Sequence, residues 1–277
     1  MPVLFISRGS MSGVHQVVSC LHEHTGIRCV SRENLTEKIN RRGEIATRVL
    51  EHIGEAVSDY DRFTRLRWPY LVLMKQALLE EILADNMVYH GYSSHLLLPV
   101  LQNFIRVRVD APVQLRVRMT MERLLCDEAA ARSYISSADE ERVGWGRLVF
   151  CRDIRDPGLY DLHLNLGHMS LKAVCGILER TLLEEEFQTR PGTRIEVEKL
   201  LLAASVEAAL VDDPRTHAFE ISAKVEDGAG AIALYGPYLD DEAVATVTEV
   251  AGRASGVGKA SYNPGYAPSL DTLDVLP

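Results

Sequence analysis

Lysine is scarce in the first two thirds of this chain of 277 residues, and a lysine-bearing phosphate loop is missing. The first lysine is Lys38, and only Lys75 and Lys172 follow before residue 193. No Gly-Lys-Ser/Thr sequence occurs, which excludes the usual P-loop signature. Arginine therefore carries most of the positive charge, and its planar guanidinium suits phosphate oxygens. Codon usage in a GC-rich genome is an alternative reason for that preference.

Long apolar runs and paired cysteines are also missing. The longest apolar stretches, such as residues 96–101, are far shorter than the ~20 residues that span a bilayer. No signal-type leader is recognisable, so we expect a cytoplasmic protein. The five cysteines show no C-x-x-C spacing, which predicts reduced thiols rather than disulfides or structural zinc. The nine histidines show no ligand spacing, and no metal site is predicted.

The acidic balance belongs to the C-terminal part of the chain. The net charge is −9, and residues 193–262 hold 6 basic against 12 acidic side chains. Neither part has the basic excess of a nucleic-acid binder. The negative C-terminal part also argues against association with an anionic membrane surface.

The opening residues 3–21 have the shape of a phosphate site. An apolar strand at 3–6 leads into a loop at 7–13 with two glycines and three serines, and an amphipathic helix follows. The N-terminus of a helix offers free N–H groups and a partial positive charge to an anion. The loop therefore predicts a phosphate cradle without its lysine.

Strands and helices alternate up to residue 187, which predicts a mostly parallel sheet flanked by helices. Ligands of such folds bind at the carboxyl ends of the strands. We expect a basic connector at 62–68, a helix that starts at Pro69 and runs to Ala84, and a helix over 127–142.

A boundary is predicted at 188–192, where the chain reads Gln-Thr-Arg-Pro-Gly. The pattern beyond it is helix, strand, strand, helix, strand, which is typical of a small α+β domain. We expect domains at 1–190 and 193–262, and a disordered tail at 263–277 with three prolines.

Four blocks in the first part resemble the cytidylate kinase-like family. They are ISRGSMSGV (6–14), VRVDAPVQLRVRM (107–119), DEAAARSYISSADEERVGW (127–145) and RDPGLYDLHLN (155–165). The resemblance implies a P-loop nucleoside monophosphate kinase fold with an arginine-bearing lid. It also implies ATP as the phosphoryl donor and Mg²⁺ as the cofactor.

The resemblance assigns roles to individual side chains. Arg116, Arg142 and the lid residue Arg152 are the expected catalytic arginines, which neutralise charge on the transferring group. Asp139 accompanies them. Arg147 and Arg155 are further lid arginines. The phosphate-binding positions are Arg8, Gly9, Ser10, Ser12, Gly13 and His15.

The sequence departs from the family pattern at three places. Met11 and Val14 stand where the family has glycines, and we expect both side chains to narrow the cradle. Gly91-Tyr92-Ser93 stands where the family has Gly-Arg-Gly/Ala. Asp110 is a candidate for water-mediated magnesium binding, but a role in shaping the turn into the helix at Pro112 is favoured over it.

Residues 224–257 are similar to a BON domain, an interaction module. Two functions therefore compete. In the first, the protein binds nucleotides and transfers phosphate from ATP to a nucleoside monophosphate. In the second, it is a catalytically degraded pseudokinase whose BON-like domain binds a protein partner for regulation or scaffolding.

Overall fold

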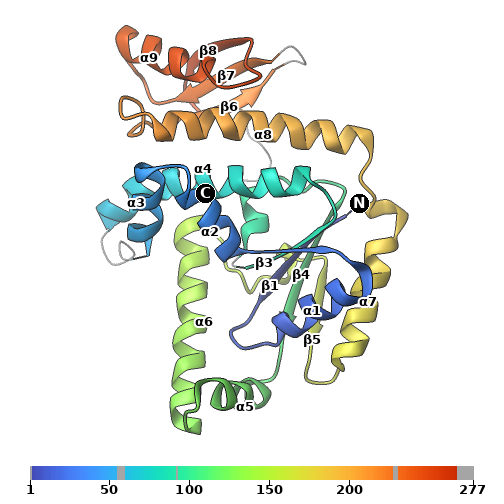
Figure 1. Cartoon of the computed structure of the whole chain (residues 1–277). Coiled ribbons are helices and arrows are strands. Elements are labelled where there is room, and N and C mark those ends of the chain that lie inside the picture. The colour runs from blue at the N-terminus through green and yellow to red at the C-terminus, as the bar shows by residue number, and fades with distance from the viewer. Residues whose placement is uncertain (1, 55–59, 92, 227–229, 267–277) are drawn as a thin grey trace. The chain divides into compact units, whose positions relative to one another are not determined.

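A computed structural model describes residues 2–54, 60–91, 93–226 and 230–266 (Figure 1). The chain forms two compact units, each discontinuous in sequence. One unit contains Met1–Arg32 and Asp85–Arg190, and the other contains Glu33–Ala84 and the residues from Pro191 onward.

The first unit is built on a five-stranded parallel sheet. Its strands are β1 (Val3–Arg8), β2 (Arg28–Ser31), β3 (Met87–Gly91), β4 (Phe104–Asp110) and β5 (Leu162–Asn165), in the order β2-β3-β1-β4-β5. Parallel pairing brings the carboxyl ends of all five strands to one edge. β1 is central, so the loop that follows it lies beside the ends of β3 and β4.

Two helices pack on one face of this sheet. α1 (Val14–Thr25) and α7 (Leu171–Leu183) bury their apolar stripes against alternate residues of the strands, including Leu4 and Ile6. The hydroxyl of Ser170 caps α7 by accepting a hydrogen bond from the N–H of Ala173. A parallel sheet flanked by helices fits a P-loop α/β fold, which confirms the predicted class of this part.

α5 (Val113–Leu124) and α6 (Glu128–Phe150) follow β4. α6 is longer than the expected helix over 127–142, because its last turn buries Val149 and Phe150. The expected lid is the segment 146–156, and its first residues, 146–150, are therefore helical. Short 3₁₀ turns lie at Ser94–Leu97, Pro157–Leu159 and Glu185–Phe187.

The second unit holds α2 (Arg32–Asn40) apart from its first residue, α3 (Glu44–Ile53), α4 (Tyr60–Leu83) and α8 (Pro191–Asp212). The expected connector at 62–68 is wrong, because these residues are helical and Pro69 lies inside α4. Buried residues such as Phe63 and Tyr70 lie on both sides of this proline, so packing holds the helix together across it.

The rest of the second unit has the expected strand and helix order. After α8 come β6 (Ser222–Val225), β7 (Ala231–Gly236), α9 (Asp241–Gly252) and β8 (Lys259–Pro264). β7 is central, antiparallel to β6 and parallel to β8. Asn263 and Pro264, which were expected in a disordered tail, pair with β7, and residues 267–277 lie outside the described residues.

Packing divides the chain differently from the linear boundaries expected at 190 and 193. The region 33–84 belongs with the C-terminal residues, because α4 packs along α8. A buried ion pair joins the two helices: Lys75 of α4 contacts Glu207 of α8, whose side chain is 2% exposed. The same carboxylate accepts a hydrogen bond from the N–H of Ala223 in β6 at 3.0 Å.

We expect Glu207→Gln to lower the free energy of unfolding of this unit by about 1–2 kcal/mol. The amide keeps an acceptor for Ala223 but leaves the Lys75 ammonium without its counter-charge. Urea unfolding followed by Trp68 fluorescence, in a Trp145→Phe background, measures the change. Glu198→Gln on the same helix is the control, because among the described residues that carboxylate pairs with the exposed Arg194. Equal losses in the two variants would contradict the structural role of Glu207.

Candidate phosphate site

The loop from Gly9 to Gly13 is shaped by backbone that only small or strained residues allow. A Cβ at Gly9 would lie 2.7 Å from Oδ1 of Asp110, so a side chain there would collide with β4. Gly13 caps α1 with a φ of 83°. Met11 has a φ of 54°, a left-handed conformation that costs an L-residue roughly 1–2 kcal/mol.

Ser10 is the best-held residue of the loop. The Nε of Arg116 donates to its carbonyl at 2.6 Å, and Nη2 donates to its hydroxyl at 2.6 Å. The Ser10 N–H and hydroxyl both donate to Oδ1 of Asp139, at 3.0 and 2.6 Å. Arg116 and Asp139 close the ring through an ion pair of 2.5 Å. This network joins the loop to α5 and α6.

The Asp139 carboxylate is thus held by a loop N–H, a loop hydroxyl and a guanidinium, the same donors that bind phosphate. Burial acts to raise its pKa, but the hydrogen bonds from Ser10 and Arg116 and the charge of Arg116 outweigh burial. The net effect is a pKa below the ordinary value. The site is therefore suited to an anion.

Arg142 and Arg8 connect α6 and α1 to the end of β1. Nη1 of Arg142 donates to the Arg8 carbonyl at 3.3 Å, which ties α6 to the end of β1. Nη1 of Arg8 lies 2.9 Å from Nε2 of His15 in the first turn of α1. Because a guanidinium only donates, Nε2 of His15 accepts, and the imidazole packs edge-on against His90 at 5.5 Å.

Ser12 carries a buried hydroxyl that the protein does not satisfy. The residue is 1% exposed, and its Oγ has no hydrogen-bond partner among the described residues. A buried hydroxyl without a partner costs about 1–3 kcal/mol, and such a group is explained by local strain, a catalytic role, or a bound water or ion. It lies one residue before the Gly13 cap of α1.

The two glycine replacements have different consequences. Met11 occupies a backbone conformation that glycine adopts without strain, as the family pattern implies. Val14 does not narrow the loop as expected, because its side chain is 1% exposed and packs in the core beneath the sheet. Only Met11 therefore alters the cradle.

A second charged cluster lies beneath the loop, and the sequence reasoning missed most of it. Nε of Arg108 donates to Oδ2 of Asp110 at 2.7 Å, and Nε2 of His163 lies 2.9 Å from the same oxygen. Burial would raise the pKa of Asp110, but Arg108 and His163 lower it overall. Residues two apart on a strand share a face, so the Arg-x-Asp spacing was the available signal.

The lid arginines lie apart from this network. Arg147 and Arg155 both pair with Asp153, at 3.0 and 2.6 Å. Arg152 lies in the exposed turn after α6, and among the described residues its guanidinium makes no hydrogen bond to the loop. Tyr92, at the position of the missing family arginine, lies outside the described residues. Of the three expected catalytic arginines, the structure brings Arg116 and Arg142 to the loop.

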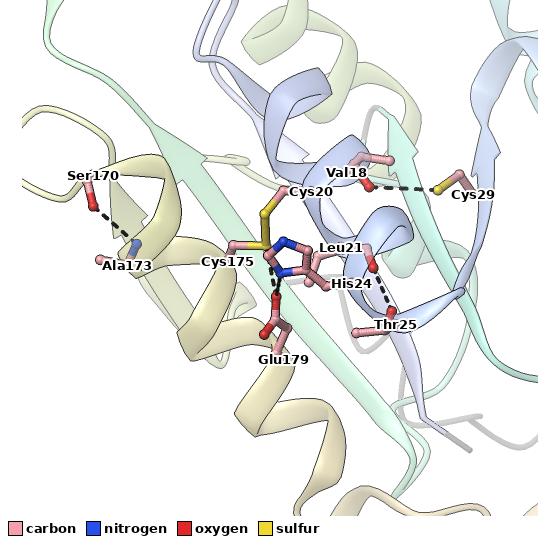
Figure 2. The surroundings of a disulfide bond; sticks show 10 residues. All are labelled: Val18, Cys20, Leu21, His24, Thr25, Cys29, Ser170, Ala173, Cys175 and Glu179. Atoms are coloured by element: carbon pink, nitrogen blue, oxygen red, sulfur yellow. Dashed lines mark hydrogen bonds and ion pairs between the residues drawn. A yellow bond between two sulfur atoms is a disulfide. The ribbon is translucent and has the colours of Figure 1, made fainter.

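The cysteines contain one correction. Cys20 of α1 and Cys175 of α7 form a disulfide, so the prediction of five reduced thiols is wrong (Figure 2). Sequence spacing could not show this pair, because its members are 155 residues apart. They meet because α1 and α7 pack side by side on the sheet.

Residues 3–168 match the model of the cytidylate kinase-like family. The match covers more than half of the chain and includes the whole network around Ser10. The chain belongs to the cytidylate kinase-like family. No curated protein sequence matches it.

Solved structures support the fold. An uncharacterized protein from Eubacterium ventriosum is 18% identical, with a TM-score of 0.50 over 66% of this chain and 98% of that one. TT1252 from Thermus thermophilus is 16% identical, with a TM-score of 0.46 over 66% and 97%. A shikimate kinase from Bacteroides thetaiotaomicron is 12% identical, with a TM-score of 0.38 over 65% and 98%. At these identities the first likeness shows the fold alone, and the two lower scores add nothing to it.

Proposed function

We propose that this member of the cytidylate kinase-like family binds ATP and transfers its terminal phosphoryl group to a nucleoside monophosphate. The observation that carries the proposal is the buried hydroxyl of Ser12, which has no partner among the described residues and lies in the loop before α1. An anion at this helix N-terminus would satisfy that hydroxyl and the neighbouring N–H groups.

The side chains around the loop divide the work of phosphoryl transfer. Arg8 and His15 flank the mouth of the loop and would bind the donor phosphates with the amides of Gly9, Ser10 and Gly13. Arg142, on α6, would contact the transferring group. Magnesium in this class of reaction is held by a loop hydroxyl, and the oxygen of Ser12 would bind the metal while its hydrogen donates to a phosphate oxygen. The metal would neutralise charge between the phosphates.

Arg116 could stabilise charge on the transferring group only if its guanidinium released the Asp139 carboxylate and bound the phosphate instead. Its guanidinium holds Asp139 and Ser10. A bound phosphate would compete with the Asp139 carboxylate for the same donors. Arg152, exposed after α6, belongs to the proposal as a lid residue that would act only after movement toward the loop.

The alternative is a pseudokinase, and one observation favours it. The N–H and hydroxyl of Ser10, together with Arg116, are already satisfied by the internal carboxylate of Asp139. A loop held in this way supports the fold without any ligand. Met11 also favours the pseudokinase, because its side chain stands where the family has a glycine in the cradle.

In either case we propose a BON-like interaction module at 193–262, with a protein partner. Its support is the order α8, β6, β7, α9, β8 and the quoted resemblance. We also propose that the protein acts in the cytoplasm, where ATP is available. No helix among the described residues is long and apolar enough to cross a membrane.

We expect ATP with Mg²⁺ to raise the melting temperature of the full chain. A ligand at 100 times its Kd adds about 2.7 kcal/mol. Ser12→Ala should weaken ATP binding about tenfold, because one hydrogen bond to a charged phosphate is lost. Ser19→Ala, at an exposed position of α1, is the matched control and should bind ATP normally.

Product analysis separates the two functions. Formation of the acceptor's own diphosphate, such as CDP from ATP and CMP, supports the kinase, provided that Ser12→Ala slows it. Stabilisation by ATP without product supports the pseudokinase. The absence of any shift at millimolar nucleotide would overturn the proposal of a nucleotide site.

A further inference from the structure

Four side chains of metal-ligand type converge where α1 packs against α7, two turns or more along α1 from the loop. Cys20 and His24 lie four residues apart on α1, and Cys175 and Glu179 lie four residues apart on α7. Residues at i and i+4 lie on the same face of a helix. Each helix therefore presents two ligand groups to the other, as Figure 2 shows.

The ligand atoms of these residues all lie within 4.8 Å of one another. Nδ1 of His24 is 2.6 Å from Oε1 of Glu179, and Sγ of Cys175 is 3.2 Å from the same oxygen. The four atoms of a tetrahedral zinc site lie about 3.3–3.8 Å apart, given bonds of about 2.0–2.3 Å. Rotation of the side chains can therefore produce a tetrahedral set without any movement of the helices.

A disulfide alone gives no reason for the other two groups. It is an uncharged crosslink that needs neither an imidazole nor a carboxylate beside it. Two thiolates, one imidazole and one carboxylate are together a complete set of four zinc ligands, with no open position left for water. Soft sulfur ligands in tetrahedral geometry favour Zn²⁺ over Mg²⁺ or Ca²⁺.

We propose that the reduced protein binds one Zn²⁺ through Cys20, His24, Cys175 and Glu179, and that the disulfide is the metal-free, oxidised state of the same site. An external dithiol gives two electrons and two protons to the Cys20–Cys175 disulfide, which becomes two thiols. The reductant is itself oxidised to a disulfide. Zn²⁺ then displaces both thiol protons and binds the two thiolates, because the thiolate is the metal ligand.

The position of the site gives the ion a structural role. α1 begins at the phosphate loop and α7 closes the same face of the sheet. Either crosslink ties these helices together. Cys175 is 1% exposed, whereas the His24 side chain is 54% exposed, so a metal ion can reach the site from the His24 side.

Cobalt titration of the full chain tests the proposal. The protein is reduced with a phosphine, the reductant is removed, and Co²⁺ is added under nitrogen. We expect one equivalent to bind, with thiolate-to-cobalt charge-transfer absorption and tetrahedral d–d bands that Zn²⁺ then abolishes. The oxidised protein should bind none. Zn²⁺ should also protect two of the five cysteines, Cys20 and Cys175, from alkylation.

Variants locate the site. Cys20→Ser should lose the charge-transfer absorption of a two-thiolate site, and His24→Ala should weaken Co²⁺ binding by more than about tenfold. Because His24 is exposed, its variant should keep the fold, which circular dichroism checks. Cys29→Ser is the matched control. Cys29 lies beside α1, where its thiol contacts the carbonyl of Val18, but it lies outside the cluster. A folded, reduced wild type without cobalt bands overturns the proposal, as do bands that Cys20→Ser retains unchanged.

Discussion

Arg116→Ala is expected to lower the free energy of unfolding of the first unit by about 3 kcal/mol. The substitution removes three hydrogen bonds to Ser10 and Asp139 at once. It leaves the Ser10 carbonyl and the Asp139 carboxylate without their strongest donor. The loop then loses its connection to α5, and nucleotide binding should fall with it.

Trp145 reports on this loss, since it is the tryptophan of the first unit. Urea unfolding followed by its fluorescence, in a Trp68→Phe background, gives the change in free energy. Arg118→Ala is the matched control, because Arg118 lies on the same helix but is exposed. A loss below about 1 kcal/mol, no larger than for ordinary surface substitutions, would show that the network adds little.

Arg116→Lys sharpens the interpretation. Lysine keeps the charge but has no fork that donates to Ser10 and Asp139 together. It should restore only part of the lost stability. If Arg116 also stabilises the transferring phosphoryl group, phosphoryl transfer by this variant should remain slow even at temperatures where it is fully folded.

Asp139→Asn tests whether the internal carboxylate competes with phosphate. The variant removes a negative charge from donors that also suit an anion, so ATP should bind several-fold more tightly. The free energy of unfolding, in contrast, should fall at neutral pH. Because the folded pKa of Asp139 is below its ordinary value, its contribution is present at neutral pH and is lost as the pH falls below about 4. The variant should therefore lack that part of the acid sensitivity.

The sequence was sufficient for the sheet and for most of the loop network. Alternating apolar strands and amphipathic helices predict a parallel α/β sheet, and four motifs in order identify the family. The structure brings four residues of these motifs, Arg8, Ser10, Arg116 and Arg142, into one hydrogen-bonded network, while their roles toward a ligand stay predictions. The motifs cannot show which groups of the network are already hydrogen-bonded to one another. That Asp139 already occupies the donors of Ser10 depends on the approach of α6 to the loop.

The failures share one physical cause, which is packing between segments distant in sequence. Pro69 reads as a helix start because proline is favoured there, yet buried residues on both sides of it keep α4 continuous. The sequence predicts that the side chain of Val14 narrows the loop. In the structure Val14 is the first residue of α1, and its side chain packs in the core. Cys20 and Cys175 read as unrelated thiols until two helices bring them together.

His95 should make the protein lose about 2 kcal/mol of stability between pH 7 and pH 5. Its imidazole is 6% exposed and packs against the rings of Tyr160 and Phe5, at 5.2 and 6.4 Å. Burial, with a smaller effect from the charge of Arg106, lowers its pKa to about 3, while the nearby Asp161 acts in the opposite direction. The folded protein therefore keeps His95 neutral.

The sign follows from the two protonation states. Below pH 6.5 the unfolded chain binds a proton at His95 that the folded protein does not bind until about pH 3. Stability from this group is complete above pH 6.5 and falls by up to about 1.4 kcal/mol for each pH unit below it. His95→Phe keeps an aromatic ring in the core and removes the titration.

Urea unfolding at pH 7, 6 and 5, followed by Trp145 fluorescence in a Trp68→Phe background, compares the protein with and without His95→Phe. The wild type should lose about 2 kcal/mol more than the variant over this range. His168→Phe replaces an exposed histidine and should keep the wild-type pH dependence. Parallel pH profiles for the wild type and His95→Phe would show that His95 is protonated within the folded protein, and that its surroundings admit the charge.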